Sequence, residues 1–297
     1  MGRALAEQFS AARQVLEEVD DALGEHLSRL MAEGPGEDLM LTRNTQPALM
    51  AASMAVVRVI ERETETSLAS HGAFVAGHSL GEYSALCAAG ALSVTETARL
   101  VRLRGEAMQQ AVPQGEGAMA ALLGVDLDVA RAIAADAAQG EVCAAANDNA
   151  PGQVVISGSR AAVERALELA GERGAKRAIL LPVSAPFHCA LMAPAGDAMA
   201  EALAEITIAP PALPLVANVT AQPVTEPAMI RRQLVEQVTA MVRWRESVQY
   251  LHAQEVETVV ELGHGKVLGG LTKRIERELQ PVSVGDVDSV EAFLSTL

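Results

Sequence analysis

The chain has 297 residues, 50% hydrophobic and 21% charged, which is enough to bury the core of one large domain or two unequal ones. Its formal charge of −15 is spread without a long basic run, so we expect neither nucleic acid nor an anionic membrane as a partner. Few aromatics and many aliphatic residues favour an α/β fold. The cysteines Cys87, Cys143 and Cys189 form no Cys-x-x-Cys pair, which favours reduced thiols and a cytoplasmic location.

Helical periodicity dominates the first quarter of the chain. It runs from residue 1 to about 33 and again from about 45 to 63, with Pro47 suited to the first turn of the second stretch. Because no apolar run reaches 18 residues, we expect neither a membrane segment nor an export leader. The apolar residues 73–77 then precede His78-Ser79-Leu80-Gly81 and a helical pattern over 82–89. This order predicts a strand, a tight turn and a helix.

The pattern changes between residues 115 and 183. It predicts a strand, a helix, two strands, a helix and a strand, over 118–125, 127–138, 143–146, 153–157, 160–172 and 175–183. The order β-α-β-β-α-β is that of a ferredoxin-like unit. We therefore expect a small domain of residues 113–189 inserted into a large domain of residues 1–112 and 190–297.

The large domain resumes after the insertion. Helices are predicted near 194–206, over 230–238, from Trp244 and after Gly265, and strands are predicted over 215–219 and 258–262. Strands that alternate with helices are typical of an α/β sheet. The large domain is therefore expected to reach the C-terminus.

Residues 77–81, Gly-His-Ser-Leu-Gly, match Gly-x-Ser-x-Gly, the strained turn that lifts a serine between a buried strand and the following helix. Such a turn aims the Ser79 hydroxyl into a cleft. It also places the N–H of Leu80 at a helix N-terminus, where a developing oxyanion is stabilised. The five-residue pattern alone is weak, but a strand before it and a helix after it favour Ser79 as a nucleophile over a purely structural turn.

A nucleophilic serine needs a general base, and the chain has six histidines. His188 follows the last strand of the inserted unit, where a chain that crosses between domains can overhang the cleft. His264 stands at a strand end, where an α/β-hydrolase places its base. The residues alone rank these two about evenly. The other four, His26, His71, His78 and His252, are interpreted as solvated, capping or turn-supporting residues.

Four motifs occur in one order along the chain: the elbow followed by Glu82-Tyr83-Ser84-Ala85, then Arg104-Gly105, then residues 151–158, then Pro186-Phe187-His188-Cys189. This series resembles the malonyl-CoA:acyl carrier protein transacylases, from near residue 1 to about residue 275. The resemblance implies an α/β-hydrolase-like large domain with an inserted ferredoxin-like domain. It also implies ping-pong transfer of malonyl from malonyl-CoA to the phosphopantetheine thiol of acyl carrier protein, through a malonyl-serine, in fatty acid biosynthesis.

The resemblance assigns roles to particular residues. Ser79 matches the nucleophile and His188 the general base, oriented by the backbone carbonyl of Gln237, whereas family members have proline at the position of His264. The N–H of Leu80 matches an oxyanion donor. Arg104 matches the arginine that pairs with the malonyl carboxylate, a role that suits its planar fork. From helical spacing alone, Arg99, Arg102 and Arg104 would instead form a solvated face.

The resemblance also bears on specificity and partners. Phe187 stands where related acyltransferases select malonyl over methyl-branched substrates, although ordinary packing explains the ring equally well. Asn149 matches a polar position near the cleft and is a substrate-binding candidate. No metal or tightly bound cofactor is implied, because the CoA thioester is a substrate, and we expect a monomer. Since acyl carrier proteins are acidic, a local basic patch is expected, with the candidates Lys176, Lys266, Lys273 and Arg274.

One departure from the family keeps two alternatives open. Members begin with a strand and a Gly-Gln-Gly-Ser-Gln loop shortly before the residues that match Met1-Gly2-Arg3, and the loop supplies a second oxyanion N–H. We expect either a true start upstream of Met1, which we favour, or a shortened protein of reduced activity. The rivals are a thioesterase or esterase that uses His264 as base, and a truncated homologue that is weakly active or only binds the carrier protein.

Overall fold

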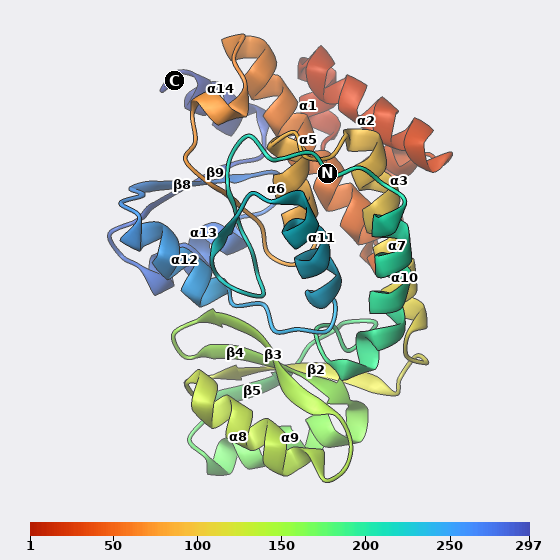
Figure 1. Ribbon diagram of the computed structural model, residues 1–297, viewed down its shortest axis with the longest axis vertical. Coiled ribbons are helices and arrows are strands. Elements are labelled where there is room, and N and C mark those ends of the chain that lie inside the picture. Colours follow the sequence, from red (N-terminus) through yellow and green to blue (C-terminus); the bar gives the residue numbers. More distant parts are fainter.

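Helices build the N-terminal quarter of the computed structural model, which describes residues 1–297 (Figure 1). They are α1 (Arg3–Gln8), α2 (Ser10–Leu23), α3 (Leu27–Glu33), α4 (Gly36–Met40) and α5 (Thr42–Thr64). The stretch predicted over residues 1–33 is thus divided, and Gly24 ends α2 with a left-handed φ of 63°. The position predicted for Pro47 is wrong. It lies inside α5, because this helix already begins at Thr42.

The middle of the chain forms the small domain at the lower end of Figure 1. Its elements are β2 (Gly117–Leu123), α8 (Leu127–Ala138), β3 (Cys143–Ala150), β4 (Gln153–Ser159), α9 (Arg160–Glu172) and β5 (Arg177–Leu180). The strands make one antiparallel sheet in the order β3-β4-β2-β5. Helices α8 and α9 cover one face of this sheet (Figure 1), over a separate core of 14 buried residues that includes Leu122, Ile133 and Ile156. The predicted ferredoxin-like arrangement is confirmed.

The large domain contains short parallel strand pairs. Strand β1 (Val75–Ala76) pairs in parallel with β6 (Leu215–Val216), which also pairs antiparallel with β7 (Pro223–Val224). Strand β8 (Thr258–Leu262) pairs in parallel with β9 (Gln280–Val284), as a separate two-stranded sheet. Parallel pairs need long crossover connections, which helices of the large domain supply.

The remaining elements of the large domain are helical. They are α6 (Gly81–Ala88), α7 (Val94–Gln110), α10 (Ala193–Ala204), α11 (Pro227–Glu236), α12 (Trp244–Ala253), α13 (Val267–Ile275) and α14 (Val287–Leu294), with short 3-10 turns η1 (Leu68–Ser70) and η2 (Ala190–Met192). Helices α2, α5, α7 and α10 supply much of a continuous core of 47 buried residues. None of the helices has the length and apolarity needed to span a membrane.

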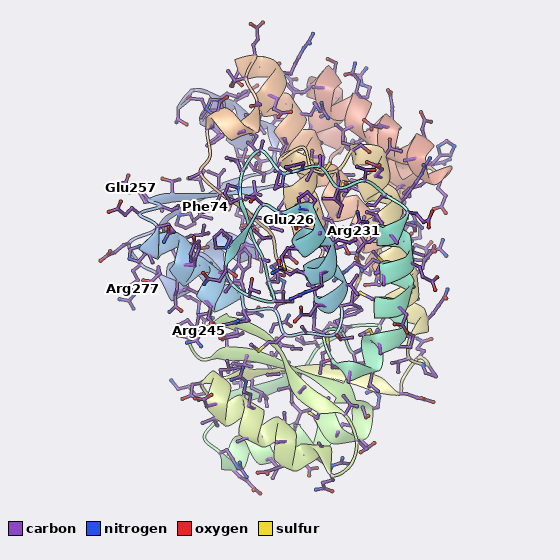
Figure 2. All side chains as sticks on the ribbon, in the orientation of Figure 1. Phe74, Glu226, Arg231, Arg245, Glu257 and Arg277 are labelled. Atoms are coloured by element: carbon purple, nitrogen blue, oxygen red, sulfur yellow. The ribbon has the colours of Figure 1, made fainter.

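The end of β3 joins the two domains. Its register shifts between Ala145 and Asn147, and the main chain of Val242 then pairs with it: Asp148 N donates to Val242 O at 2.9 Å, and Val242 N donates to Ala146 O at 2.9 Å. The Asp148 carboxylate is 1% exposed and accepts from Arg245 of α12 at 2.8–2.9 Å. Figure 2 places Arg245 at this junction. The small domain is therefore anchored to the large one by main-chain bonds and a buried ion pair.

We predict that Arg245→Met lowers the free energy of unfolding by about 3 kcal/mol, because it leaves the buried Asp148 carboxylate without its counter-ion. Chemical denaturation measures this change. The matched control is Arg29→Met, which removes an arginine from an exposed pair with Glu33. Equal midpoints for the two variants would show that the junction does not depend on this ion pair.

Candidate active site

The serine elbow lies between β1 and α6, as the motif predicts. A Cβ on Gly77 would lie 2.0 Å from the carbonyl carbon and oxygen of Gly81, so the turn closes only with glycine there. Ser79 has a φ of 53°, a strained value for a residue with a side chain. The N–H of Leu80 has no hydrogen-bond partner in the structure. It is therefore a free donor beside the serine.

Asn218, which follows β6, holds the elbow in place. Its Oδ1 accepts from the N–H of Ser79 at 2.7 Å, and its Nδ2 donates to the carbonyl of Gly77 at 2.8 Å. Both ends of the amide are thus bonded to the turn, and its side chain is fully buried. A strained turn of this kind persists only when its surroundings determine it, and Asn218 provides such a constraint.

His188 lies against the serine. Its Nε2 is 2.8 Å from Ser79 Oγ, and its Nδ1 is 2.9 Å from the carbonyl oxygen of Gln237. Because a carbonyl only accepts, Nδ1 carries the proton and Nε2 accepts from the hydroxyl. Burial lowers the pKa of His188 to about 3, the charge of Arg104 adds to this effect, and the bond to Gln237 opposes it. The ring is therefore neutral at physiological pH.

The structure separates the two histidines that the sequence ranked about evenly. His264 is exposed and forms no hydrogen bond with Ser79, whereas His188 is buried and does. His188 also has a left-handed φ of 58°, so both members of the pair occupy strained backbone positions. The geometry brings Ser79 and His188 together and leaves His264 outside.

Arg104, on α7, lies beside Ser79. A capping box between Ser93 and Glu96 sets the start of this helix. The solvated face suggested by helical spacing is wrong for Arg104 and Arg102, which are 1% and 8% exposed, because α5 packs against that side of α7. Only Arg99 of the three is exposed.

The guanidinium of Arg104 reaches acceptors from three parts of the chain. Nη1 donates to Gln46 Oε1 of α5 at 2.8 Å, and Nη2 donates to Gln237 Oε1 at 2.8 Å and to Ser79 Oγ at 3.0 Å. Its Nε is buried and has no partner. The Ser79 hydroxyl thus contacts an imidazole and a cation, and the Nε–H of the cation is among the donors left free for an incoming acceptor.

The polar residues that the sequence analysis missed also lie here: Gln46, Glu82 and Asn218, together with the side chain of Gln237. Glu82 accepts from the N–H of Asn218 at 2.8 Å and from Nε2 of Gln237. Burial raises the pKa of Glu82 to about 7, against the hydrogen bonds from Asn218 and Gln237 and the charge of Arg104. The single charged residue of α6 was the signal available in the sequence.

The two remaining candidates, Asn149 and Phe187, contact or adjoin residues next to the Ser79–His188 pair. Asn149 Oδ1 lies 2.9 Å from His78 Nε2, so this side chain of the small domain contacts the elbow. Burial lowers the pKa of His78, and its ring lies 5.6 Å from that of Trp244. Phe187 precedes His188, and its ring is partly buried. It packs against the core of the large domain and against a small cluster of Met119, Ala146 and Val155. No group of three or more His, Cys, Asp or Glu side chains is placed to hold a metal ion.

Known proteins resemble this chain over nearly all of its length. A family model described as an acyl transferase domain matches residues 1–287. The malonyl CoA-acyl carrier protein transacylases of Bacillus subtilis and Escherichia coli are 46% and 45% identical, over 100% and 98% of this chain and 92% and 93% of their own lengths.

Solved structures show the same likeness. An acyl-carrier-protein-S-malonyltransferase from Bartonella henselae matches with a TM-score of 0.97 and 54% identity, over 100% of this chain and 94% of that one. A malonyl-transacylase in complex with a type II PKS acyl-carrier protein matches with a TM-score of 0.96 and 43% identity, over 100% and 95%. The chain belongs to the acyl transferase domain family, as one of its malonyl CoA-acyl carrier protein transacylases.

Proposed function

We propose that this protein transfers a malonyl group from malonyl-CoA to the phosphopantetheine thiol of acyl carrier protein, a step of fatty acid biosynthesis. One observation carries the proposal. Ser79 Oγ lies 2.8 Å from His188 Nε2 and 3.0 Å from Arg104 Nη2, so the nucleophile contacts both a base and a buried cation. A cation at that place selects an acyl group that carries its own carboxylate.

In the first half-reaction His188 Nε2 takes the proton of Ser79 as Oγ attacks the thioester carbonyl. The oxygen of the tetrahedral intermediate is stabilised by the free N–H of Leu80. When the intermediate collapses, the C–S bond breaks and the CoA sulfur receives the proton from His188. The carbonyl of Gln237 keeps the Nδ1 proton in place throughout. The product is a malonyl ester on Ser79.

The second half-reaction repeats these steps in reverse order. His188 takes the proton of the carrier protein's thiol, the sulfur attacks the ester carbonyl, and Ser79 leaves with the proton returned by His188. The cycle is therefore ping-pong. It uses only these side chains and the CoA thioester, so we propose no tightly bound cofactor. The three free thiols and the CoA substrate fit a cytoplasmic location.

Arg104 holds the malonyl carboxylate in this proposal. Its Nε is buried without a partner, and a guanidinium can donate through Nε and Nη2 to both oxygens of one carboxylate. Pairing with the substrate moves Nη2 off Ser79 Oγ and frees the hydroxyl for attack. Phe187 beside the base narrows the space at the α-carbon, which disfavours methyl-branched acyl groups, and Asn149 lines the same approach from the small domain, which we place at residues 113–189.

The esterase alternative finds less support in the geometry. It requires His264 at the serine, whereas His264 is exposed and away from Ser79. A buried cation beside the nucleophile also gives no advantage with a neutral acyl group. The alternative of a module that only binds the carrier protein does not account for the hydrogen-bonded Ser79 and His188.

The first test is acylation by malonyl-CoA, measured by intact mass and rapid quench. We expect a malonyl adduct on the unmodified protein, none on Ser79→Ala, and a rate lowered by roughly 10²- to 10⁴-fold in His188→Ala. His264→Ala is the matched control and should acylate at the unmodified rate. Normal transfer by His188→Ala, or loss of it in His264→Ala, would support the esterase arrangement instead.

The second test concerns the protonation of His188. Because burial lowers its pKa to about 3 from 6.5, the folded protein keeps this ring neutral while the unfolded chain takes up a proton as the pH falls through 6.5. The contribution of His188 therefore makes the free energy of unfolding decrease as the pH falls below 6.5. We expect its ¹⁵N imidazole resonances, assigned with His188→Gln, to stay unchanged between about pH 8 and 5. A titration centred near 6.5 would show that the ring is solvated.

The third test concerns docking of the carrier protein. Lys273 and Arg274 are exposed on α13, and Arg274 Nη1 bonds to Gln153 Oε1 of the small domain at 2.7 Å, so this surface spans both domains. We expect Lys273→Glu with Lys266→Glu to raise the KM for the acidic carrier protein about tenfold or more at low salt, and to leave acylation by malonyl-CoA unchanged. Arg29→Glu on α3 is the control. An unchanged KM would place the docking surface elsewhere.

A further inference from the structure

Glu82 has no part in the proposed reaction, yet its carboxyl group lies within the site. It is 1% exposed and stands three residues after Ser79, in the first turn of α6. Its Oε1 accepts from Asn218 N at 2.8 Å and its Oε2 accepts from Gln237 Nε2. A buried carboxyl group is costly unless it is hydrogen bonded, so both partners are needed to keep it there.

Gln237 connects this carboxyl group to the reacting residues. Its Nε2 also donates to the carbonyl of Ser79 at 2.9 Å, and its Oε1 accepts from Arg104 Nη2 at 2.8 Å. Its main-chain carbonyl accepts from His188 Nδ1. Gln237 therefore contacts Ser79, Arg104 and His188. The NH₂ end of its side-chain amide donates to Ser79 and Glu82, and the oxygen end accepts from Arg104.

We propose that Glu82 is a positioning residue: its carboxylate sets the orientation of the Gln237 amide, which in turn holds the Arg104 guanidinium beside Ser79. Both oxygens of Glu82 accept, one from Asn218 N–H and one from Gln237 Nε2, and the carbonyl of Ser79 accepts from the same Nε2. The NH₂ end of the amide therefore faces Glu82 and its oxygen faces Arg104, which only donates. The inference rests on the proposed function, because that function makes Arg104 the ligand of the malonyl carboxylate.

Glu82→Gln separates this role from simple packing, because it keeps the shape and replaces one acceptor by an NH₂ donor. The new donor meets either the N–H of Asn218 or Nε2 of Gln237, which are both donors. If the Gln237 amide turns over to accept, its NH₂ end faces Arg104 and its oxygen faces the carbonyl of Ser79. Either orientation of the new amide therefore loses a hydrogen bond. If the Gln237 amide turns over, the bond that is lost is the one from Arg104 Nη2 to Gln237 Oε1.

The experiment measures single-turnover acylation of Ser79 by malonyl-CoA and by acetyl-CoA, which lacks the free carboxylate. In Glu82→Gln we expect the malonyl rate to fall about 10- to 100-fold and the acetyl rate to change much less, so the malonyl-to-acetyl ratio falls. Partial unfolding lowers both rates together and leaves the ratio unchanged. The control is Glu261→Gln, since Glu261 also accepts from two N–H groups, those of Leu268 and Gly269, and should keep the ratio.

A double-mutant cycle identifies the path. If Glu82 acts through Gln237, Gln237→Met lowers the ratio by a similar factor while its main chain still holds His188, and adding Glu82→Gln to it changes the ratio little further. Equal effects of Glu82→Gln in both backgrounds would overturn the inference. If Glu82→Gln does not fold, Glu82→Asp decides: its shorter side chain does not reach both Asn218 N–H and Gln237 Nε2, so a lowered ratio supports the inference and an unchanged ratio overturns it.

The outcomes also separate this inference from the proposed function. No malonyl adduct on the unmodified protein would overturn the function and, with it, the task given to Arg104. A normal adduct on the unmodified protein, with an unchanged or raised ratio in Glu82→Gln, would overturn the positioning role alone.

Discussion

The burial of one guanidinium is the constraint on which the rest of the site depends. Arg104 is 1% exposed, and a buried charge that loses its partners costs several kcal/mol. Its donors lie in a plane and point in fixed directions, so the acceptors must come from different sides. They come from Gln46 on α5, from the elbow at Ser79 and from Gln237 after α11. Helices that are distant in the sequence are thereby held in one arrangement.

The reacting pair is assembled by the same bonds. Ser79 and His188 are 109 positions apart, and both have left-handed backbone conformations that need external support. Asn218 supports the elbow and the carbonyl of Gln237 supports the imidazole. Because Glu82 bonds to both Asn218 and Gln237, the residues Ser79, His188 and Arg104 are joined in one hydrogen-bond network. A change in any of its members is expected to affect the others, since such networks are coupled.

The small domain also contributes residues to the site. Its strand β3 is irregular where it meets Val242, and this irregularity brings Asn149 to His78 beside the serine. The ion pair between the buried Asp148 and the partly exposed Arg245, which Figure 2 labels at the junction, holds this strand end against the large domain. His188 also falls within residues 113–189, so the small domain provides the imidazole beside Ser79 as well as the contact from Asn149 to His78.

The sequence by itself predicted Ser79 as the nucleophile and determined the order of the elements in the small domain, because both depend on short-range patterns. The glycines around Ser79 specify a tight turn, and the alternation of strands and helices over residues 117–180 specifies the ferredoxin-like order. The residues alone ranked His188 and His264 about evenly and the resemblance favoured His188. The tertiary structure brings only His188 to Ser79 and shows Arg104 to be buried. A helical period marks one face of α7 but does not say that α5 covers it. Glu82 and Asn218 were missed for the same reason: Asn218 meets Gly77 across 141 positions, and no local pattern records such a contact.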